Sequence, residues 1–339
     1  MSEPVLSPPA PFVATDHRHP RRTRATAWLL FATGLWGLSF PLTKVLLLAQ
    51  LRLVPGADTW FLAALGLVFR FGVAAVLLAA VVGRNLRGLT RLEVVQGVGL
   101  GIFATGGMIF QLDGLHYTAA STSAFLTSCY CVTIPVIVAV QRRRWPPGLV
   151  IVSCALATAG IGVLAGFDWR TLRLGRGEAE TMVSSLFFAA QIFWLERPAF
   201  ARNGTARVTV VMFAVLAAVA TPVLAARAPG AGAVWTAAFG SAAVVGCLLL
   251  LTALCTLTTF TLMNHWQRDL EATEAGLIYC AEPLWTSVFA LFLPAWLAAW
   301  TATDYANETP TLRLLLGGGF ITAANVCIQL RPRAVTPVR

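Results

Sequence analysis

The sequence predicts an all-α, polytopic membrane protein with ten transmembrane helices, arranged as two inverted five-helix repeats. Of the 339 residues, 57% are hydrophobic and 12% are charged, with a mean hydropathy of +0.73, which leaves too little polar surface for a soluble protein. Apolar stretches of about 20 residues, the length that crosses a bilayer, recur along nearly the whole chain. The loops between these stretches alternate between many arginines and few.

The first half of the chain begins with a tail, residues 1–25, that combines five prolines with four arginines. This composition is typical of a disordered segment. The apolar run that follows is too long for a signal peptide and has no small-residue cleavage pattern, so we expect a retained first helix. Loops rich in Arg, Pro, Gly, Asp and Asn delimit the predicted spans at 26–50, 59–83, 92–113, 117–140 and 147–166.

The second half repeats this rhythm, with predicted spans at 178–196, 206–227, 235–264, 273–299 and 311–330 and a tail at 331–339. The fourth and ninth spans each place a proline after a polar and aromatic stretch, SCYCVTIP ending at Pro135 and GLIYCAEP ending at Pro283. Residues 26–166 and 178–330 are therefore the two expected repeats. Because five is odd, the second repeat enters the membrane from the opposite face, an arrangement that many secondary transporters share.

Arginine placement predicts the orientation of the chain. Cytoplasmic loops near membrane spans carry excess Lys and Arg, and seventeen arginines fall on the side of both termini against six on the other side. We expect both termini in the cytoplasm and the protein in the inner membrane of a bacterium. The net charge of +10 follows from this topology, and a nucleic-acid partner is not expected, because the basic residues lie between apolar segments instead of on one face.

Four segments resemble a known family: LWGLSFPLTK in the first span, FRFG in the second, HYTAASTSAFLTS leading into the fourth and EAGLIYCAEPLW in the ninth. In their order and spacing over residues 26–330 they resemble the EamA-type transporters of the drug/metabolite transporter superfamily. The resemblance implies ten helices in two repeats, cytoplasmic ends, and export or exchange of amino acids, metabolites or drugs. That family usually closes its fourth and ninth helices with a Gly-Glu pair, which residues 141–144 and 293–300 do not contain, so the role of those glutamates is not carried over.

Among the charged residues within the predicted spans, where each charge costs roughly 2.5 to 3.5 kcal/mol to insert, three stand out as site candidates: Lys44, Arg70 and Glu282. Lys44 shares one helical stripe with Trp36 and Phe40, so a cation and two aromatic rings would face one cavity. Alternatively, the Lys44 ammonium reaches toward the outer surface of the membrane. Both interpretations stay open.

The other two charges are deeper in their helices. Arg70 lies about eleven residues into the second span, roughly 16 Å deep. There its guanidinium would bind a solute carboxylate, or alternatively it would form a structural ion pair or donate to backbone carbonyls. Glu282 forms a polar strip with Tyr279 and Thr286 on the ninth span. It is a candidate to bind and release a proton during transport, unless Arg70 or Lys44 keeps it ionised.

Three prolines are candidate hinges, Pro41, Pro135 and Pro283, because a proline within a helix frees the carbonyl four residues earlier. They are equally compatible with static kinks. Tyr130 and Gln191 complete the candidate substrate-binding set. They lie on weaker polar stripes whose other members are Ser and Thr: Ser123, Thr127, Ser184, Thr252, Thr256 and Thr259. These hydroxyls either line a pathway or, as we expect for most of them, form hydrogen bonds within their own helix or with a neighbouring one.

These residues predict an alternating-access carrier for a small solute, with proton or counter-solute coupling. The chain has no GxxxxGK[ST] phosphate loop, which disfavours ATP-driven transport. An accessory subunit without transport of its own stays open as an alternative. A membrane enzyme is less supported, because neither Glu282 nor His265 has a nucleophile, metal cluster or second carboxylate predicted nearby. The seven cysteines lie in apolar stretches as packing residues, so we expect no metal or cofactor, and the oligomeric state is not predicted.

Overall fold

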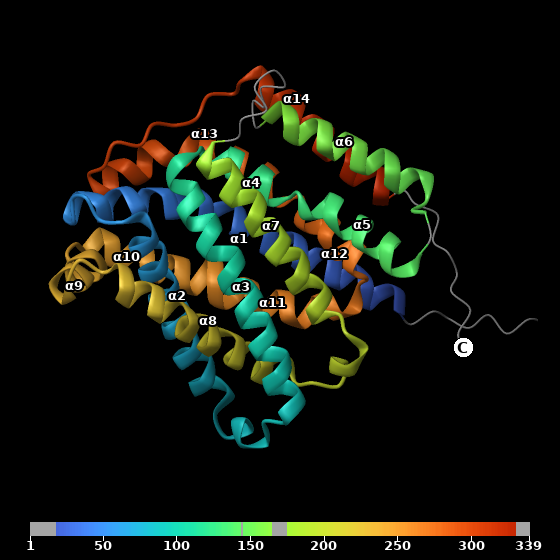
Figure 1. Cartoon of the computed structure of the whole chain (residues 1–339), viewed down its shortest axis with the longest axis horizontal. Helices are drawn as coiled ribbons and strands as arrows, with labels where there is room; N and C mark the ends of the chain where they lie inside the picture. Colours follow the sequence, from blue (N-terminus) through green and yellow to red (C-terminus); the bar gives the residue numbers. More distant parts are fainter. Residues whose placement is uncertain (1–17, 144, 165–174, 330–339) are drawn as a thin grey trace, which may run out of the picture.

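The computed structural model describes residues 18–143, 145–164 and 175–329. All regular structure in these ranges is helical (Figure 1), which confirms the all-α prediction. The first half contains α1 (Arg18–Leu53), α2 (Thr59–Val82), η1 (Gly83–Gly88), α3 (Arg91–Tyr117), α4 (Ala120–Thr127), α5 (Tyr130–Arg142) and α6 (Gly148–Leu164). The second half contains α7 (Arg176–Leu195), η2 (Pro198–Phe200), α8 (Thr205–Arg227), α9 (Ala231–Phe239), α10 (Ala242–Leu250), η3 (Leu251–Thr258), α11 (Thr259–Trp266), η4 (Gln267–Asp269), α12 (Ala272–Tyr279), α13 (Glu282–Thr301) and α14 (Leu312–Gln329).

The helices identify a polytopic membrane protein. Within the described residues, six continuous helical segments are long and apolar enough to cross a bilayer: Arg21–Leu53, Thr59–Gly88, Arg91–Tyr117, Thr205–Arg227, Ala242–Asp269 and Glu282–Thr301. Shorter apolar helices cover Gly148–Gly160 and Leu312–Ala324. Every apolar segment that the sequence predicts as a span is mostly helical, although not always as one continuous helix.

Three predicted spans are interrupted. The span predicted at 117–140 is broken at Ser128 and Cys129, and the one at 273–299 is broken at Cys280 and Ala281. The side chains of Thr127 and Ser128 donate to carbonyls four residues earlier, a pattern that bends helices. The span predicted at 235–264 is divided because α9 ends at Phe239 and Ser241 caps α10 through its bond with the Ala243 amide.

The first helix also differs from its predicted range, since α1 begins at Arg18 instead of residue 26 and places Arg21 and Arg22 on the helix. These two arginines pair with Asp269 and Glu274, respectively. The ion pairs extend α1 by two turns beyond its apolar part. The tail before residue 18 lies outside the described residues.

Glycines allow α3 to pack closely against its neighbours α7 and α8. A Cβ atom on Gly97 would lie 2.6 Å from the Cβ of Val211, and one on Gly101 would lie 2.7 Å from the Cβ of Val215. The GxxxG spacing of Gly97 and Gly101 therefore lets α3 approach α8 closely. Another GxxxG spacing in the sequence, Gly162 and Gly166, ends outside the described residues.

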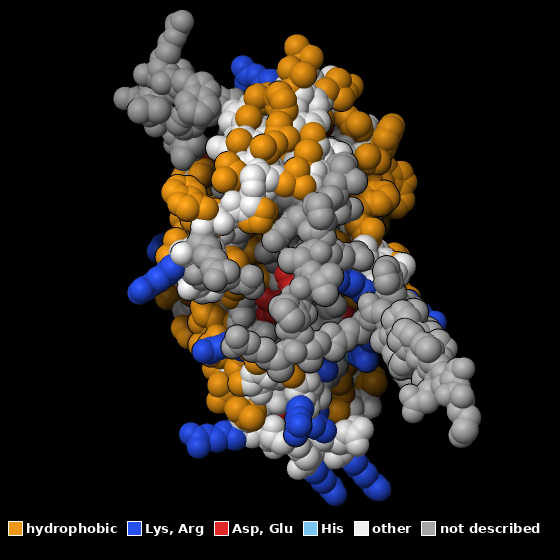
Figure 2. Space-filling model, turned by 90° about the vertical axis from the view of Figure 1, so that its right-hand side faces the viewer, with side chains coloured by type: hydrophobic (Ala, Val, Ile, Leu, Met, Phe, Trp, Pro, Cys, Tyr) orange, Lys and Arg blue, Asp and Glu red, His pale blue; other side chains and the backbone are white. Residues whose placement is uncertain are grey.

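The outer surface is apolar around the sides of the molecule. Large hydrophobic side chains that are two-thirds or more exposed include Val81, Val140, Trp235, Phe292 and Trp296. Figure 2 shows hydrophobic side chains spread over the flanks. A soluble protein rarely exposes so much contiguous apolar surface, whereas a bilayer would cover it.

Basic side chains gather at one end of the molecule. The start of α1 and the end of α14 lie at this end, on the right in Figure 1, with the segment that joins α5 to α6, and the segments that join α2 to α3 and α7 to α8 lie below them. Viewed from that end, Lys and Arg side chains surround a central recess in which Asp or Glu side chains are visible (Figure 2). At the same end Glu93 is buried and paired with Arg207, which joins α3 to α8.

Candidate functional site

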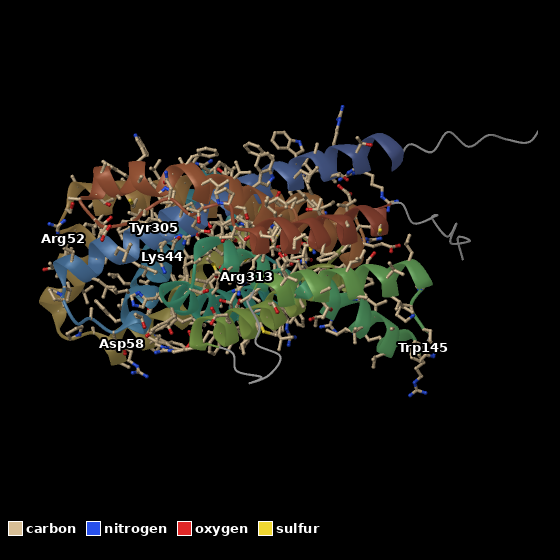
Figure 3. The ribbon with its side chains drawn as sticks, turned by 90° about the horizontal axis from the view of Figure 1, so that it is seen from above. Lys44, Arg52, Asp58, Trp145, Tyr305 and Arg313 are labelled. Atoms are coloured by element: carbon tan, nitrogen blue, oxygen red, sulfur yellow. The ribbon has the colours of Figure 1, made fainter. Side chains whose placement is uncertain are left out.

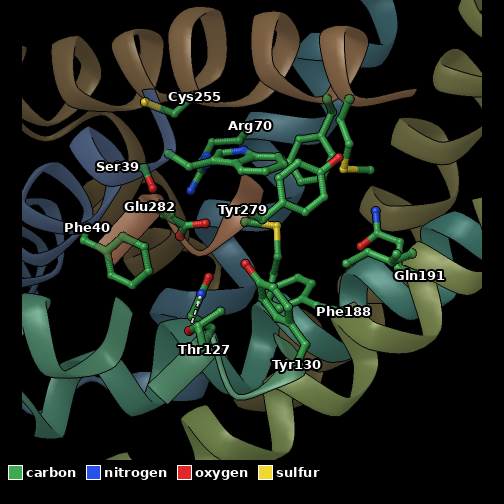
Figure 4. Close-up of a pocket in the computed structure, with 16 residues that line it drawn as sticks. Ser39, Phe40, Arg70, Thr127, Tyr130, Phe188, Gln191, Cys255, Tyr279 and Glu282 are labelled. Atoms are coloured by element: carbon green, nitrogen blue, oxygen red, sulfur yellow. Dashed lines mark hydrogen bonds between the residues drawn. The ribbon is translucent and has the colours of Figure 1, made fainter. Parts of the chain in front are cut away.

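A cavity lies among α1, α2, α3, α7, η3 with α11, and two of the interrupted helices, α4–α5 and α12–α13 (Figure 4). Its volume is about 70 Å³, enough for a few water molecules. Seven of the eight predicted substrate-binding residues line it: Trp36, Phe40, Arg70, Tyr130, Gln191, Tyr279 and Glu282. The other lining residues are Ser39, Met108, Gln111, Thr127, Phe188, Ile192, Cys255, Phe260 and Met263.

Two opposite charges face this cavity without pairing with each other. Arg70 is 2% exposed, and its Nε and Nη2 donate to Thr256 Oγ1 over 3.1 and 3.0 Å. Glu282 is 7% exposed, and within the described residues no hydrogen bond or ion pair involves its carboxylate. Both side chains point into the cavity (Figure 4). A buried charge without a full partner is costly, so groups of this kind are typical of binding sites.

The unusual geometry of η3 positions the partner of Arg70. Residues Leu251–Thr258 form a π-helical segment between α10 and α11, and such segments often occur at functional sites. This segment places Cys255 in the cavity wall and Thr256 against Arg70. Ser184, Thr252 and Thr259 instead donate to carbonyls of their own helices, as expected for most of the weaker polar stripes.

Both interrupted helices present residues from the two sides of the break to the cavity. Thr127 and Tyr130 flank the break between α4 and α5, and Tyr279 and Glu282 flank the break between α12 and α13. Pro283 is the second residue of α13 and does not kink a continuous helix, because a proline is well tolerated in the first helical turn. By contrast, α1 and α5 continue through Pro41 and Pro135.

Aromatic rings form much of the remaining wall. The Trp36 ring contacts Tyr279 and Phe260 edge to face, with centroids 5.4 and 5.6 Å apart. The Tyr279 hydroxyl donates to Gln267 Oε1 over 2.8 Å, so its proton already has a partner, and the residue lines the cavity. These rings give the cavity an apolar region beside its charged region.

One amide in the wall lacks a protein partner. Gln191 is 3% exposed, its Nε2 is buried, and no hydrogen bond to this atom exists within the described residues. Gln111, in contrast, donates from Nε2 to Thr127 Oγ1 over 2.9 Å. Gln111 and Ser39 line the cavity but are not among the predicted residues. Gln111 is a polar side chain within an apolar span, and Ser39 lies three residues after Trp36, and these positions are the signals that point to them.

Lys44 is not part of this cavity. Its Nζ donates to the backbone oxygens of Leu115, His116 and Thr118 over 2.6, 3.0 and 2.9 Å. Lys44 therefore binds the C-terminal end of α3, where the helix dipole favours a cation. Neither of the two interpretations from the sequence included this contact.

Comparisons with known proteins agree with a membrane protein. No family model matches the chain. Over 271 residues it is 25% identical to a protein of Archaeoglobus fulgidus named as an uncharacterized transporter, and the match covers 80% of this chain and 78% of that protein. A protein crystal structure is similar with a TM-score of 0.62 at 15% identity, covering 91% of this chain and 97% of the other. At this identity the second similarity supports the fold alone.

Proposed function

We propose that this protein is a secondary transporter of the inner membrane, which exports or exchanges a small amphipathic solute by alternating access through the cavity. The observation that carries the proposal is the pair Arg70 and Glu282, two buried opposite charges that face one cavity without pairing. The distant similarity to a protein named as a transporter and the resemblance to the EamA-type family support it.

The proposal includes ten spans in two inverted repeats, residues 26–166 and 178–330, with both termini in the cytoplasm. Helix packing supports it, because α2 packs on α8 and α6 packs on α14, which are equivalent helices of the two halves. Two further kinds of contact occur twice, once for each proposed repeat. The third span of one repeat packs on the first span of the other, as α3 on α7 and as η3 and α11 on α1. The fourth span of one repeat packs on the first span of the other, as α4 on α7 and as α13 on α1. The two interrupted helices also occupy equivalent positions, which favours a binding site at the breaks.

The lining residues suggest the chemistry of the solute. The Arg70 guanidinium suits a carboxylate, and the Glu282 carboxylate suits an ammonium group. The rings of Trp36, Phe260 and Tyr279 suit an apolar or aromatic body. The cavity must widen to admit such a molecule, since about 70 Å³ is smaller than an ordinary ligand pocket. Glu282 is also the group that would couple transport to a proton or a counter-solute, and Pro41, Pro135 and Pro283 would be the hinges.

Three matched probes test the charge recognition: L-phenylalanine, 3-phenylpropanoate and 2-phenylethylamine, which share a ring and differ in their charged groups. Binding to the purified protein is measured by calorimetry. We expect the zwitterion to bind best, because it satisfies both buried charges. Arg70→Met should weaken the two carboxylate probes, and Glu282→Gln the two amine probes, each by about 30-fold or more, since removing one member of a buried charge pair costs about 2 to 5 kcal/mol.

Arg52→Met and Glu271→Gln are the matched controls, because both residues are exposed and lie outside the cavity. Folded Arg70 and Glu282 variants that bind all three probes like these controls would contradict the proposal, as would a wild-type protein that binds none. Flux is then measured with the purified protein alone in liposomes. Binding without flux would favour the alternative of an accessory subunit.

A further inference from the structure

Residues 302–311, between α13 and α14, fold back along α13. Ala302 has a φ of 54°, a left-handed conformation that reverses the chain after the helix. Pro294 has no N–H, so the carbonyl of Ala290, four residues earlier, lacks its helical partner. The Glu308 N–H donates to that carbonyl over 2.9 Å, and Asn307 Oδ1 accepts from the Ala295 N–H over 2.9 Å. The proline thus creates the backbone groups that hold this segment.

From this position Glu308 reaches across to the other half of the protein. Its carboxylate accepts from the Ser121 backbone N–H over 3.4 Å and also from the Ser121 hydroxyl. Ser121 lies in the first turn of α4, where the helix dipole favours an anion. Glu308 therefore connects the segment between α13 and α14 to the start of α4.

Lys44 and Glu308 bind opposite sides of the turn between α3 and α4. The turn between α3 and α4 is bound at the end of α3 by the Lys44 ammonium and at the start of α4 by the Glu308 carboxylate. Lys44 and Tyr305 both lie away from the end that carries Trp145 (Figure 3). Each charge stabilises the helix end that its sign suits.

This turn borders the cavity through Phe40. Phe40 lies one helical turn before Lys44, lines the cavity, and forms a buried cluster with Leu115, Ala120 and Ala124. The cluster therefore separates the cavity from Lys44 and Glu308. Movement of α4 away from Phe40 would open the cavity toward residues 302–311, and the contacts of Glu308 oppose that movement.

We infer that Lys44, Ser121 and Glu308 form a latch, which keeps the cavity closed at this end and releases when the solute passes. This inference rests on the proposed transport function only for the passage of solute; the closure itself is a property of the structure. Solvent access to the cavity should therefore depend on Glu308 whether or not a solute is known. Cys255 lines the cavity and is a suitable reporter of that access.

The test uses a variant in which Cys255 is the remaining cysteine and measures its labelling rate with a small anionic methanethiosulfonate reagent. Glu308→Gln removes the charge and should accelerate labelling by roughly 10-fold, the effect of losing about 1.4 kcal/mol of a charge-assisted hydrogen bond. The matched control is Asp304→Asn, which removes the same charge from an exposed residue of the same segment, for which the described residues show no hydrogen bond or ion pair. We expect that variant to label at the original rate.

Equal labelling rates for the Glu308 and Asp304 variants, both folded by their melting temperatures, would overturn the latch. If Glu308→Gln does not fold, Ser121→Ala removes the hydroxyl that donates to Glu308 and should accelerate labelling in the same direction, with an unchanged rate counting against the latch. The labelling rate tests the latch and the solute flux tests transport, so the two proposals can fail separately. Faster labelling without any solute flux would retain the latch and reject transport by the protein alone.

Discussion

Gln191 is the lining residue with the clearest unmet hydrogen bond. Its amide lies in the cavity wall, and Nε2 is buried without a partner in the described part of the chain. The donor and acceptor of an amide can exchange by a flip of the side chain, so either orientation offers the cavity one unused group. A buried donor left without a partner costs about 1 to 3 kcal/mol, which a solute with a suitably placed acceptor would recover.

Gln191→Leu should therefore change the selectivity between solutes with and without a hydrogen-bond acceptor more than it changes the affinity for apolar solutes. We expect the wild-type protein to bind L-tyrosine about 5- to 10-fold more tightly than L-phenylalanine, because the added hydroxyl supplies an acceptor worth about 1 kcal/mol. The Leu variant should lose this ratio while it still binds L-phenylalanine. Calorimetric titration of both amino acids against both proteins measures the ratio. A Leu variant that keeps the preference for L-tyrosine would rule out Gln191 as its cause.

At the scale of the elements, α3 packs closely against both α7 and α8. Its glycines at 97 and 101 lie against α8, and Gly114 lies against the carbonyl of Gly177 at the start of α7. Van der Waals packing and not the hydrophobic effect drives helix association within lipid, so the absence of a side chain at these positions stabilises the contact. The same helix carries Gln111 into the cavity and ends at the carbonyls that Lys44 binds.

Gly97→Ala should destabilise the protein, because the added Cβ would lie 2.6 Å from the Cβ of Val211 and 2.9 Å from the Val208 carbonyl oxygen. Overpacking of this kind typically costs about 1 to 3 kcal/mol. Gly66→Ala in α2 is the control, since a Cβ there would meet no atom within 4 Å. The melting temperatures of the two variants in detergent provide the comparison. Equal melting temperatures would show that α3 and α8 separate easily.

For the whole molecule, the arrangement of the helices determines which segments share a face of the membrane. Arg87 lies between α2 and α3, at the bottom of Figure 1, whereas Asp304 lies between α13 and α14, on the opposite, upper side. Arginine-rich segments favour the cytoplasmic side. The proposed topology therefore places these two residues on opposite sides of the bilayer.

Single cysteines introduced by Arg87→Cys and Asp304→Cys, after replacement of the native cysteines, test this topology in intact cells. A membrane-impermeant thiol reagent should label the cysteine at 304 from outside and the cysteine at 87 only after the cells are permeabilised. Permeabilised samples serve as the positive control for both. Labelling of both cysteines from outside would contradict the inverted-repeat proposal, since an odd number of spans between the two positions would then be excluded.

Hydropathy and composition by themselves determined that the chain is helical and membrane-embedded, and they located the apolar segments. This was possible because the cost of placing a residue in lipid depends mainly on that residue and its near neighbours along the helix. The same reasoning found Arg70 and Glu282, since a charge within a span is conspicuous in any arrangement of helices. It also found the paired motifs at Pro135 and Pro283, although not the helix breaks that precede them.

Only the tertiary structure decided what these groups contact. Lys44 meets carbonyls that lie 71 to 74 residues further along the chain, and Glu308 meets Ser121 across 187 residues. Helical spacing shows which side of its own helix a residue occupies, but the partner on that side depends on how helices cross, break and reverse. For that reason the stripe of Trp36, Phe40 and Lys44 was visible in the sequence, while its division between a cavity and the end of α3 was not.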